Sequence, residues 1–375
     1  MTSPPHPFVI RNEVRSLTAF RFLAAFYVFL FHIQIRAPVF GDGPLGDFIA
    51  EGAVGMTMFF MLSGFILSHA YNGIKIDLRA YFWNRVARIY PIYALAALLA
   101  LPWLARDILA ESAASSWLFG LLAGAILIVS GLLLVQAWLP QTFVMWNNSA
   151  SWSISNEAFF YALFPYLSDI LRAVKASRLL LILVGLSILS AMIPASAIVF
   201  SKAPDSFALF YASPIFRLPE FVAGIVTYHL MQQTEWTARI QNLLFLVLLA
   251  GLAHVALLGA ILPGYTLHNW ILIPAVGAAL VLLFRLDTTK RHIPGGAVAV
   301  WLGQISYCFY SFQFHVLEGL KWLAPPETVG NVGFLCLACG LLLAVAAAAH
   351  HLVEEPARIW IRNWVGSSAA GKTAQ

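Results

Sequence analysis

Long apolar runs recur along almost the whole of this chain, and no other feature constrains its fold as strongly. A helix that crosses the hydrocarbon core of a bilayer needs about 20 predominantly apolar residues. Ten stretches come close to that requirement: 16–36, 48–71, 90–106, 152–171, 179–200, 214–232, 241–262, 268–285, 298–324 and 332–353. The sequence therefore predicts an all-α polytopic integral membrane protein with about ten transmembrane helices.

The charged residues support this fold class by their scarcity and their spacing. Only 10% of the residues are charged and 61% are hydrophobic, whereas a soluble domain carries about 25% charged residues. The net charge of +5 does not come from a single basic patch, because Lys and Arg occur in short clusters between the apolar runs. A soluble enzyme is thereby excluded, and the expected partner is the lipid bilayer, with no nucleic acid.

The distribution of Lys and Arg predicts the orientation, because cytoplasmic loops of membrane proteins are enriched in positive charge. With ten spans and the N-terminus inside, sixteen Lys and Arg residues fall in cytoplasmic segments, and only Arg36, Arg106 and Lys202 fall outside. Counting the apolar run 117–138 as an eleventh span would reverse everything after it, so we expect it to be re-entrant or interfacial. Aromatic residues and arginines share the segment 77–89, which predicts an amphipathic helix at the cytoplasmic interface.

Arg21 and His32 lie on the first predicted span, where charged side chains are costly and are therefore functional candidates. Their separation of 11 positions leaves them about 20° from a common helix face and about 16 Å apart along the axis. Arg21 is then near the cytoplasmic end and His32 nearer the outer side. The alternative is structural: Arg21 extends to the interface, and His32 bonds a neighbouring carbonyl group.

Other polar residues fall at two depths when positions are converted at about 1.5 Å per residue. The depth of His32 is shared by Glu157, Arg217, Glu220, Gln313 and His315. The depth of Arg21 is shared by Ser63, Arg85 and Arg88. Guanidinium groups match the geometry of phosphates, and His with a carboxylate suits removal of a hydroxyl proton. The two layers suggest a donor held from inside and an acceptor reached from outside, although proton-coupled transport would use similar layers.

We expect no metal site. The His and carboxylate residues lack ligand spacing on any one helix. His350 and His351 are adjacent in sequence, so they point to different faces of a helix, and capping or interfacial placement is the expectation.

Six local sequences carry a family resemblance. They are LTAFRFLAAFYVFLFH (17–32), FFMLSGFILS (59–68), RVARIYPIY (85–93), SWSISNEAFFYALFP (151–165), FRLPEFVAGI (216–225) and VEEPAR (353–358). In this order they resemble the blocks of the membrane-bound acyltransferase 3 family, which includes O-antigen, exopolysaccharide and Nod-factor O-acyltransferases. The resemblance spans residues 15–358, nearly the whole chain.

The resemblance implies acyl transfer from cytoplasmic acyl-CoA, a donor substrate and not a tightly bound cofactor. By position it implies three catalytic residues: His32 as the general base, Arg21 as its companion and Glu157 as a site carboxylate. We expect Glu157 or Glu220 to orient the imidazole. It implies a donor site formed by Arg85, Arg88, Ser63 and Gly64. For the two small residues, helix packing is the alternative.

A late block, ISYCFYSFQFH (305–315), departs from the family pattern SYxxYLxH. Gln313 stands where the family has His, and His315 is displaced by two residues, about 200° around a helix. We expect both residues to contact the acceptor, together with Arg217 and Glu220.

The expected protein is a single membrane acyltransferase domain over 1–375, with a core at 15–358 and a cytoplasmic tail at 359–375. Its expected function is to move an acyl group onto a hydroxyl of a cell-surface or secreted glycan or a lipid-linked oligosaccharide. Acetyl is the expected acyl group. The expected location is the bacterial inner membrane, with both termini cytoplasmic. Two other functions stay open: a transporter or flippase for a lipid-linked glycan or a proton-coupled solute, and a non-catalytic partner in glycan assembly.

Overall fold

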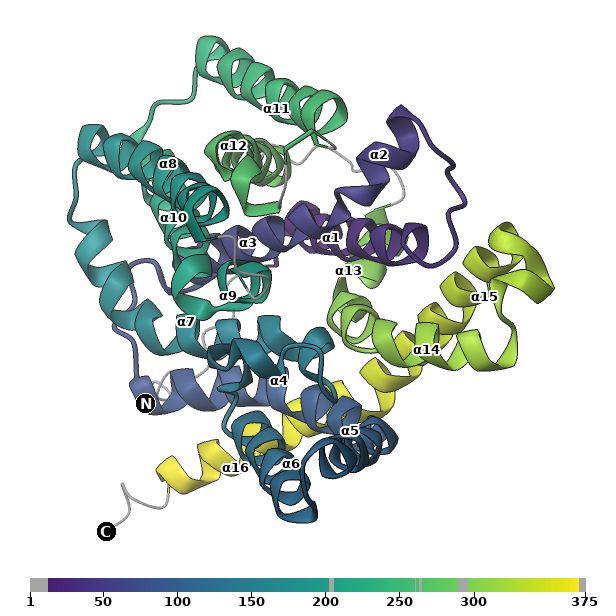
Figure 1. The fold of residues 1–375 in the computed structure, drawn as a ribbon. Helices are drawn as coiled ribbons and strands as arrows, with labels where there is room; N and C mark the ends of the chain where they lie inside the picture. The colour runs from purple at the N-terminus through teal and green to yellow at the C-terminus, as the bar shows by residue number, and fades with distance from the viewer. Residues whose placement is uncertain (1–12, 202–205, 260, 263–264, 289–295, 371–375) are drawn as a thin grey trace.

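The computed structural model describes residues 13–201, 206–259, 261–262, 265–288 and 296–370, and within these ranges it contains helices and no strands (Figure 1). The first eight helices are α1 (Arg15–Gln34), α2 (Pro44–Ala50), α3 (Gly55–Tyr71), α4 (Leu78–Leu99), α5 (Leu101–Ala114), α6 (Trp117–Leu132), α7 (Asn148–Arg172) and α8 (Ala176–Ser201). The others are α9 (Ser206–Ala212), α10 (Pro214–Gln233), α11 (Ala238–Leu258), α12 (Asn269–Thr288), α13 (Gly296–Ser311), α14 (Gln313–Leu323), α15 (Pro326–Ala349) and α16 (Glu355–Ala370). The all-α prediction is confirmed.

The predicted number of ten spans is wrong by the criteria of length and composition. Within the described residues, seven helical segments are long and apolar enough to cross a membrane, and the bent pair α4–α5 brings the number to eight if it counts as one span. Two predicted spans do not qualify. The run 298–324 is divided at Phe312 into α13, of 16 residues, and α14, of 11. In α7 the polar stretch NSASWSISNE makes up the first ten residues, so that helix is long but too polar.

The segment 77–89 is helical, but it does not form a separate interfacial helix. Asp77 caps its start by accepting bonds from the amides of Arg79 and Ala80. The helix then continues through Pro91 to Leu99 as α4, and the chain bends by 56° before α5. The same helix that carries Arg85 and Arg88 therefore also enters the apolar body.

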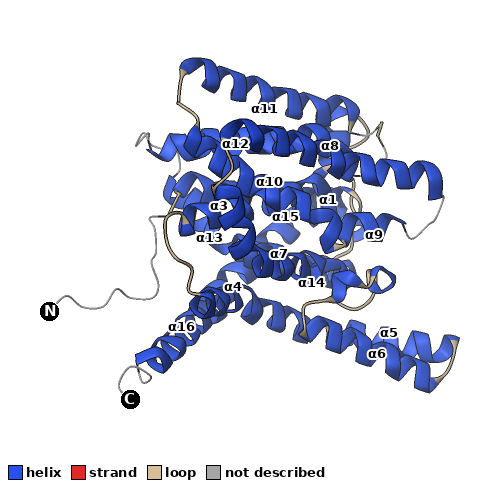
Figure 2. Cartoon of the chain, turned by 90° about the vertical axis from the view of Figure 1, so that its left-hand side faces the viewer, coloured by secondary structure: helices blue, strands red, loops and turns tan. Residues whose placement is uncertain are grey.

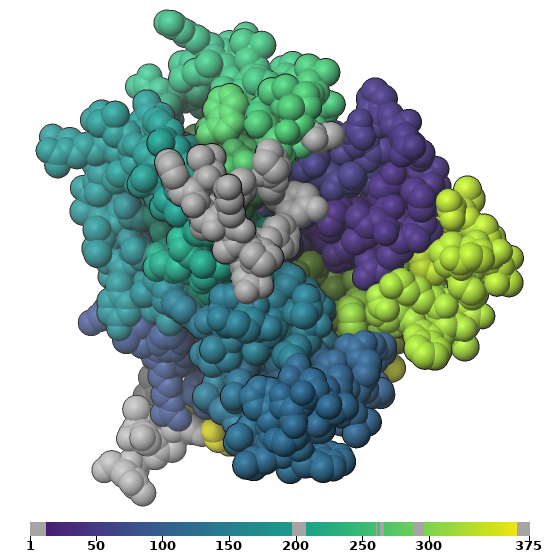
Figure 3. All heavy atoms as spheres, in the orientation of Figure 1, coloured from purple at the N-terminus to yellow at the C-terminus, as the bar shows by residue number. Residues whose placement is uncertain are grey.

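The run 117–138 forms α6 and two short turns, and α6 pairs with α5 as a hairpin. At 16 residues it spans about 24 Å, less than the roughly 30 Å of a hydrocarbon core. Gly120 and Gly124 let it approach Ser112 and Ile108 of α5 closely. Figure 2 shows the hairpin extending away from the main body, and in Figure 3 its atoms form a lobe at the lower edge. This agrees with the expectation that 117–138 makes no full crossing.

The centre of the fold is built on two close helix crossings, α3 with α10 and α1 with α13. A Cβ atom at Gly64 would lie 2.2 Å from the carbonyl oxygen of Phe221, and one at Gly224 would lie 2.0 Å from that of Met61. Small residues of this kind allow membrane helices to pack backbone against backbone. Gly64 therefore faces α10, which favours helix packing, the alternative to its predicted role in the donor path.

The expected tail, 359–375, is not independent of the core within the described residues. It belongs to α16, which packs along α4: the Nε atom of Arg362 donates to Oδ1 of Asn84 at 3.1 Å, and the rings of Trp364 and Trp83 lie 5.2 Å apart. Residues 371–375 lie outside the described ranges. Because α16 directly follows the turn His350–Glu354, this packing also holds that turn in place.

Candidate active site

Five of the predicted site residues line one cavity between α1, α3, α4, α7 and α13. We call it the inner cavity. The predicted residues in its wall are Arg21, Ser63, Arg85, Arg88 and Glu157. Each comes from the helix that the sequence motifs assigned to it, so the fold brings together groups that are far apart in the chain.

Aromatic rings hold the guanidinium groups of the inner cavity in place. Arg85 lies over the ring of Tyr161, 5.6 Å from its centroid, and Arg88 lies 5.5 Å from that of Tyr307. The Tyr161 hydroxyl donates to Glu157 at 2.8 Å, and the Tyr307 hydroxyl donates to the carbonyl of Ile89 at 2.6 Å. Cation–π contacts of this kind attract a cation without neutralising it, so Tyr161 positions Arg85 without cancelling its charge toward an anion in the cavity.

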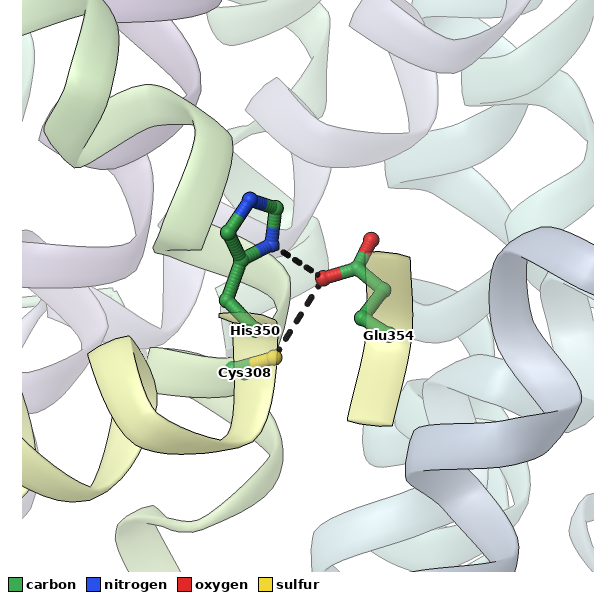
Figure 4. Close-up of side chains that lie close together, drawn as sticks. All are labelled: Cys308, His350 and Glu354. Carbon is green, nitrogen blue, oxygen red and sulfur yellow. Dashed lines mark hydrogen bonds and ion pairs between the residues drawn. The ribbon is translucent and has the colours of Figure 1, made fainter. Parts of the chain in front are cut away.

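Arg88 also forms an ion pair with Glu354, a residue to which sequence reasoning gave no role. Glu354 has no exposed side-chain surface. Its other carboxylate oxygen, Oε2, lies 2.8 Å from Nδ1 of His350 and 3.3 Å from Sγ of Cys308 (Figure 4). Residues His350–Glu354 form one π-helical turn, a feature that often occurs at functional sites. The only available signal was that Glu354 belongs to the block VEEPAR.

Two groups of described residues have ligand atoms that all lie within 4.8 Å of one another: the partly exposed set His350, His351 and Glu355, and the fully buried set Cys308, His350 and Glu354. We consider the buried set. The set offers sulfur, nitrogen and oxygen, which zinc accepts. However, Arg88 already occupies the remaining carboxylate oxygen and balances its charge. We interpret the three residues as a support that holds Arg88 in position through Glu354, and not as a metal site. His350 is buried and bonded to Glu354, whereas His351 is exposed. The two residues therefore do not share the interfacial placement expected for the pair.

His32 lines a second cavity, which we call the outer cavity. Its Nδ1 atom lies 2.9 Å from Oε1 of Gln313. The amide nitrogen of Gln313 donates to the carbonyl of Ala25 at 3.2 Å, which fixes the amide orientation. Nδ1 of the ring must therefore carry the proton of this bond, and Nε2 is left as the proton acceptor of a neutral imidazole.

Glu157 does not share the layer of His32, contrary to expectation. It lines the inner cavity with the arginines, whereas His32 lines the outer cavity. Depth was counted from residue 152, but α7 begins at Asn148, so Glu157 lies about a turn deeper than that count implied. The side chain that orients His32 is Gln313 and not Glu157 or Glu220.

Arg217 and Glu220 form a buried pair on α10 and line neither cavity. Nε of Arg217 lies 3.1 Å from Oε2 of Glu220, with 1% and 0% of the side chains exposed. Glu220 also accepts from Thr57 at 3.1 Å and from Asn269 at 2.6 Å. The guanidinium lies over the rings of Phe60, Trp152 and Tyr211. These contacts point to a structural role and not to the expected contact with the acceptor.

His315 also lies away from the outer cavity. Its Nε2 atom is 2.8 Å from the carbonyl oxygen of Ala96, and its ring contacts Trp103. The displacement by two residues thus turns it toward α4 and α5, while Gln313 takes the position next to His32. Sequence reasoning missed Tyr161, Tyr307 and Tyr310 as wall residues, because tyrosines in apolar helices give no distinct signal.

Comparison with known proteins gives the family. A family model described as an acyltransferase domain, acyltransferase 3, matches residues 14–351. The chain belongs to the acyltransferase 3 family. As a member of this family it is an acyltransferase and a multi-pass membrane protein, in agreement with its apolar helices. The family resemblance inferred from the six sequence blocks is confirmed.

Similar proteins with curated names are found for this acyltransferase. It is 30% identical to the acyltransferase MdmB of Streptomyces mycarofaciens, over 93% of this chain and 92% of the relative. It is 26% identical to the exopolysaccharide production protein ExoZ of Rhizobium meliloti, over 83% of this chain and 91% of the relative. It is 26% identical to a putative acetyltransferase of Acidianus two-tailed virus, over 86% of each. No solved structure matches the chain significantly.

Proposed function

We propose that this acyltransferase moves a short acyl group, which we take to be acetyl, from cytoplasmic acyl-CoA to a sugar hydroxyl. The acceptor would be a cell-surface or secreted glycan, either free or linked to a lipid. The enzyme would lie in the bacterial inner membrane with both termini in the cytoplasm. The observation that carries the proposal is the pair of adjoining cavities, one lined by three arginines and the other by His32. The names of two relatives, an exopolysaccharide production protein and a putative acetyltransferase, support the acceptor and the acyl group.

The donor would be held in the inner cavity. Arg21, Arg85 and Arg88 all line it, and guanidinium groups bind phosphate oxygens in a bidentate manner. Coenzyme A carries several phosphates, so its nucleotide end would lie against this cluster and its thioester would point toward the outer cavity. Glu157, which also lines this cavity, is proposed as the site carboxylate that balances the arginines when no donor is bound.

His32 would act as the general base on the acceptor. Its Nε2 atom takes the proton of the sugar hydroxyl while the hydroxyl oxygen attacks the thioester carbonyl. The carbon–sulfur bond then breaks, the sulfur leaves as the thiolate of CoA, and the proton on His32 passes to it. General base catalysis of this kind contributes about 10²- to 10⁴-fold. Gln313 would keep the proton on Nδ1 throughout, so that Nε2 does the proton transfer.

The test is transfer of label from acetyl-CoA to a glycan acceptor by purified protein. His32→Ala should lose transfer by about 10²- to 10⁴-fold and still bind labelled acetyl-CoA. His351→Ala is the matched control, because His351 is exposed. Equal transfer by wild type and His32→Ala would remove His32 from its proposed role. A wild type that binds no acyl-CoA would overturn the proposed donor.

A further inference from the structure

The inner and outer cavities share two wall residues, Met56 of α3 and Tyr310 of α13. Of the side chains that line them, only these two face both spaces. Met56 is 3% exposed. The Tyr310 hydroxyl lies 2.9 Å from the hydroxyl of Ser153 on α7, and its ring lies 5.8 Å from that of Phe59. A flexible thioether and a tethered phenol therefore stand between the two cavities.

We infer that Met56 and Tyr310 form a partition between the inner and outer cavities, and that the space they leave sets the length of the acyl group that is transferred. This inference rests on the proposed function for the chemistry of the donor. If CoA lies among the arginines and the hydroxyl lies beside His32, the thioester must sit between them, at the partition. The acyl chain then has to fit beside Met56 and Tyr310.

The chemistry of the two residues suits this position. Met has three rotatable bonds and fills irregular space without a fixed shape, so it can yield to an acetyl group and still close the passage afterwards. Tyr310 cannot move as freely, because its hydroxyl is bonded to Ser153. A partition would also keep water of the opposite face away from the thioester, so that the thioester reacts with the sugar hydroxyl and is not hydrolysed.

The first test compares acetyl-CoA with butyryl-CoA as donors. In Met56→Ala the ratio of kcat/KM for butyryl-CoA to that for acetyl-CoA should rise about tenfold or more, the lower end of what methylene groups in an apolar pocket discriminate. Met58→Ala is the matched control, because Met58 lies two residues along α3, faces a separate apolar groove and should leave the ratio within about twofold. Met56→Trp should bind acetyl-CoA but lose transfer. An unchanged ratio in folded Met56→Ala would overturn the proposed control of acyl length.

A second test does not depend on activity. Ser63→Cys places a thiol in the inner cavity and Ser149→Cys places one in the outer cavity, each in a chain whose native cysteines are replaced. A charged methanethiosulfonate added to oriented vesicles should reach each thiol from one face only. Adding Met56→Ala should let the reagent reach Ser63→Cys from the face that labels Ser149→Cys.

The two tests separate the possible failures. Equal labelling of Ser63→Cys from both faces, with Met56 intact, would overturn the partition whatever the enzyme transfers. Absence of transfer from every thioester would overturn the proposed function, and with it the control of acyl length, while the labelling result would still decide whether the partition exists.

Discussion

The Nδ1 atom of His32 lies 2.9 Å from Oε1 of Gln313, although the two residues are 281 positions apart in the chain. Gln313 is itself held by its bond to the carbonyl of Ala25, on the helix that carries His32. An amide oxygen can only accept, so the pair assigns the ring proton to Nδ1. The position at which the family pattern has His thus carries a residue that selects the tautomer of the proposed base.

Gln313→Leu should lower kcat for acetyl transfer by at least about tenfold, because the imidazole can then place its proton on Nε2 and lose its basic lone pair there. Gln313→Glu keeps an acceptor at the same place and should retain much more activity than Gln313→Leu. Steady-state rates on folded, detergent-purified protein provide the measurement. If Leu and Glu at this position give the same rate, selection of the tautomer is not the role of Gln313.

Glu354→Gln should raise the KM for acyl-CoA by about tenfold, equivalent to about 1.4 kcal/mol, and change kcat less. Glu354 holds Arg88 at the inner cavity but lines neither the inner nor the outer cavity itself, so its loss should release the arginine from its position. The neighbouring Glu355 offers a matched control: its side chain is 42% exposed, and Glu355→Gln should leave KM within about twofold. Equal effects of the two variants would remove Glu354 from this positioning role.

Gly64→Ala and Gly224→Ala should each lower the thermal stability, since the new methyl group would lie about 2 Å from a carbonyl oxygen on the facing helix. Gly185→Ala and Gly340→Ala are matched controls within α8 and α15, where a Cβ atom meets nothing within 4 Å. These should be neutral or stabilising, because Ala favours a helix over Gly by about 1 kcal/mol. Melting temperatures in detergent decide the matter. A stability of Gly64→Ala equal to that of Gly185→Ala would contradict the close crossing of α3 and α10.

Glu220→Ala should destabilise the protein by about 3–5 kcal/mol, because it leaves the buried guanidinium of Arg217 without its partner. The double variant Arg217→Met, Glu220→Leu should regain most of that loss, since apolar replacement of a whole buried pair is often neutral. Unfolding in denaturant measures both effects. If the double variant is stable and still transfers acetyl, the pair is structural, whereas stable protein without transfer would restore the predicted contact with the acceptor.

The sequence by itself determined the fold class and the helices that carry five of the residues lining the inner cavity. Apolar length is a local property of the chain, so the long runs indicate membrane helices without any knowledge of packing. The motifs containing Arg21, Ser63, Arg85, Arg88 and Glu157 likewise placed each residue on the correct helix. The number of spans could not be predicted correctly from the sequence. Helix breaks such as the one at Phe312 and the bend between α4 and α5 depend on how the helices pack.

Only the tertiary structure decided which of these residues meet. Counting along a helix estimates depth, but the rotation of each helix about its axis is set by its neighbours, and a rotation moves a side chain from one cavity to another or to none. Gly64 faces α10 beside Ser63, which faces the inner cavity, and Glu157 joins the arginines and not His32. The partners Gln313 and Glu354 come from the end of the chain, 281 and 266 positions from His32 and Arg88. Contacts over such separations arise from helix packing, which a local sequence pattern does not predict.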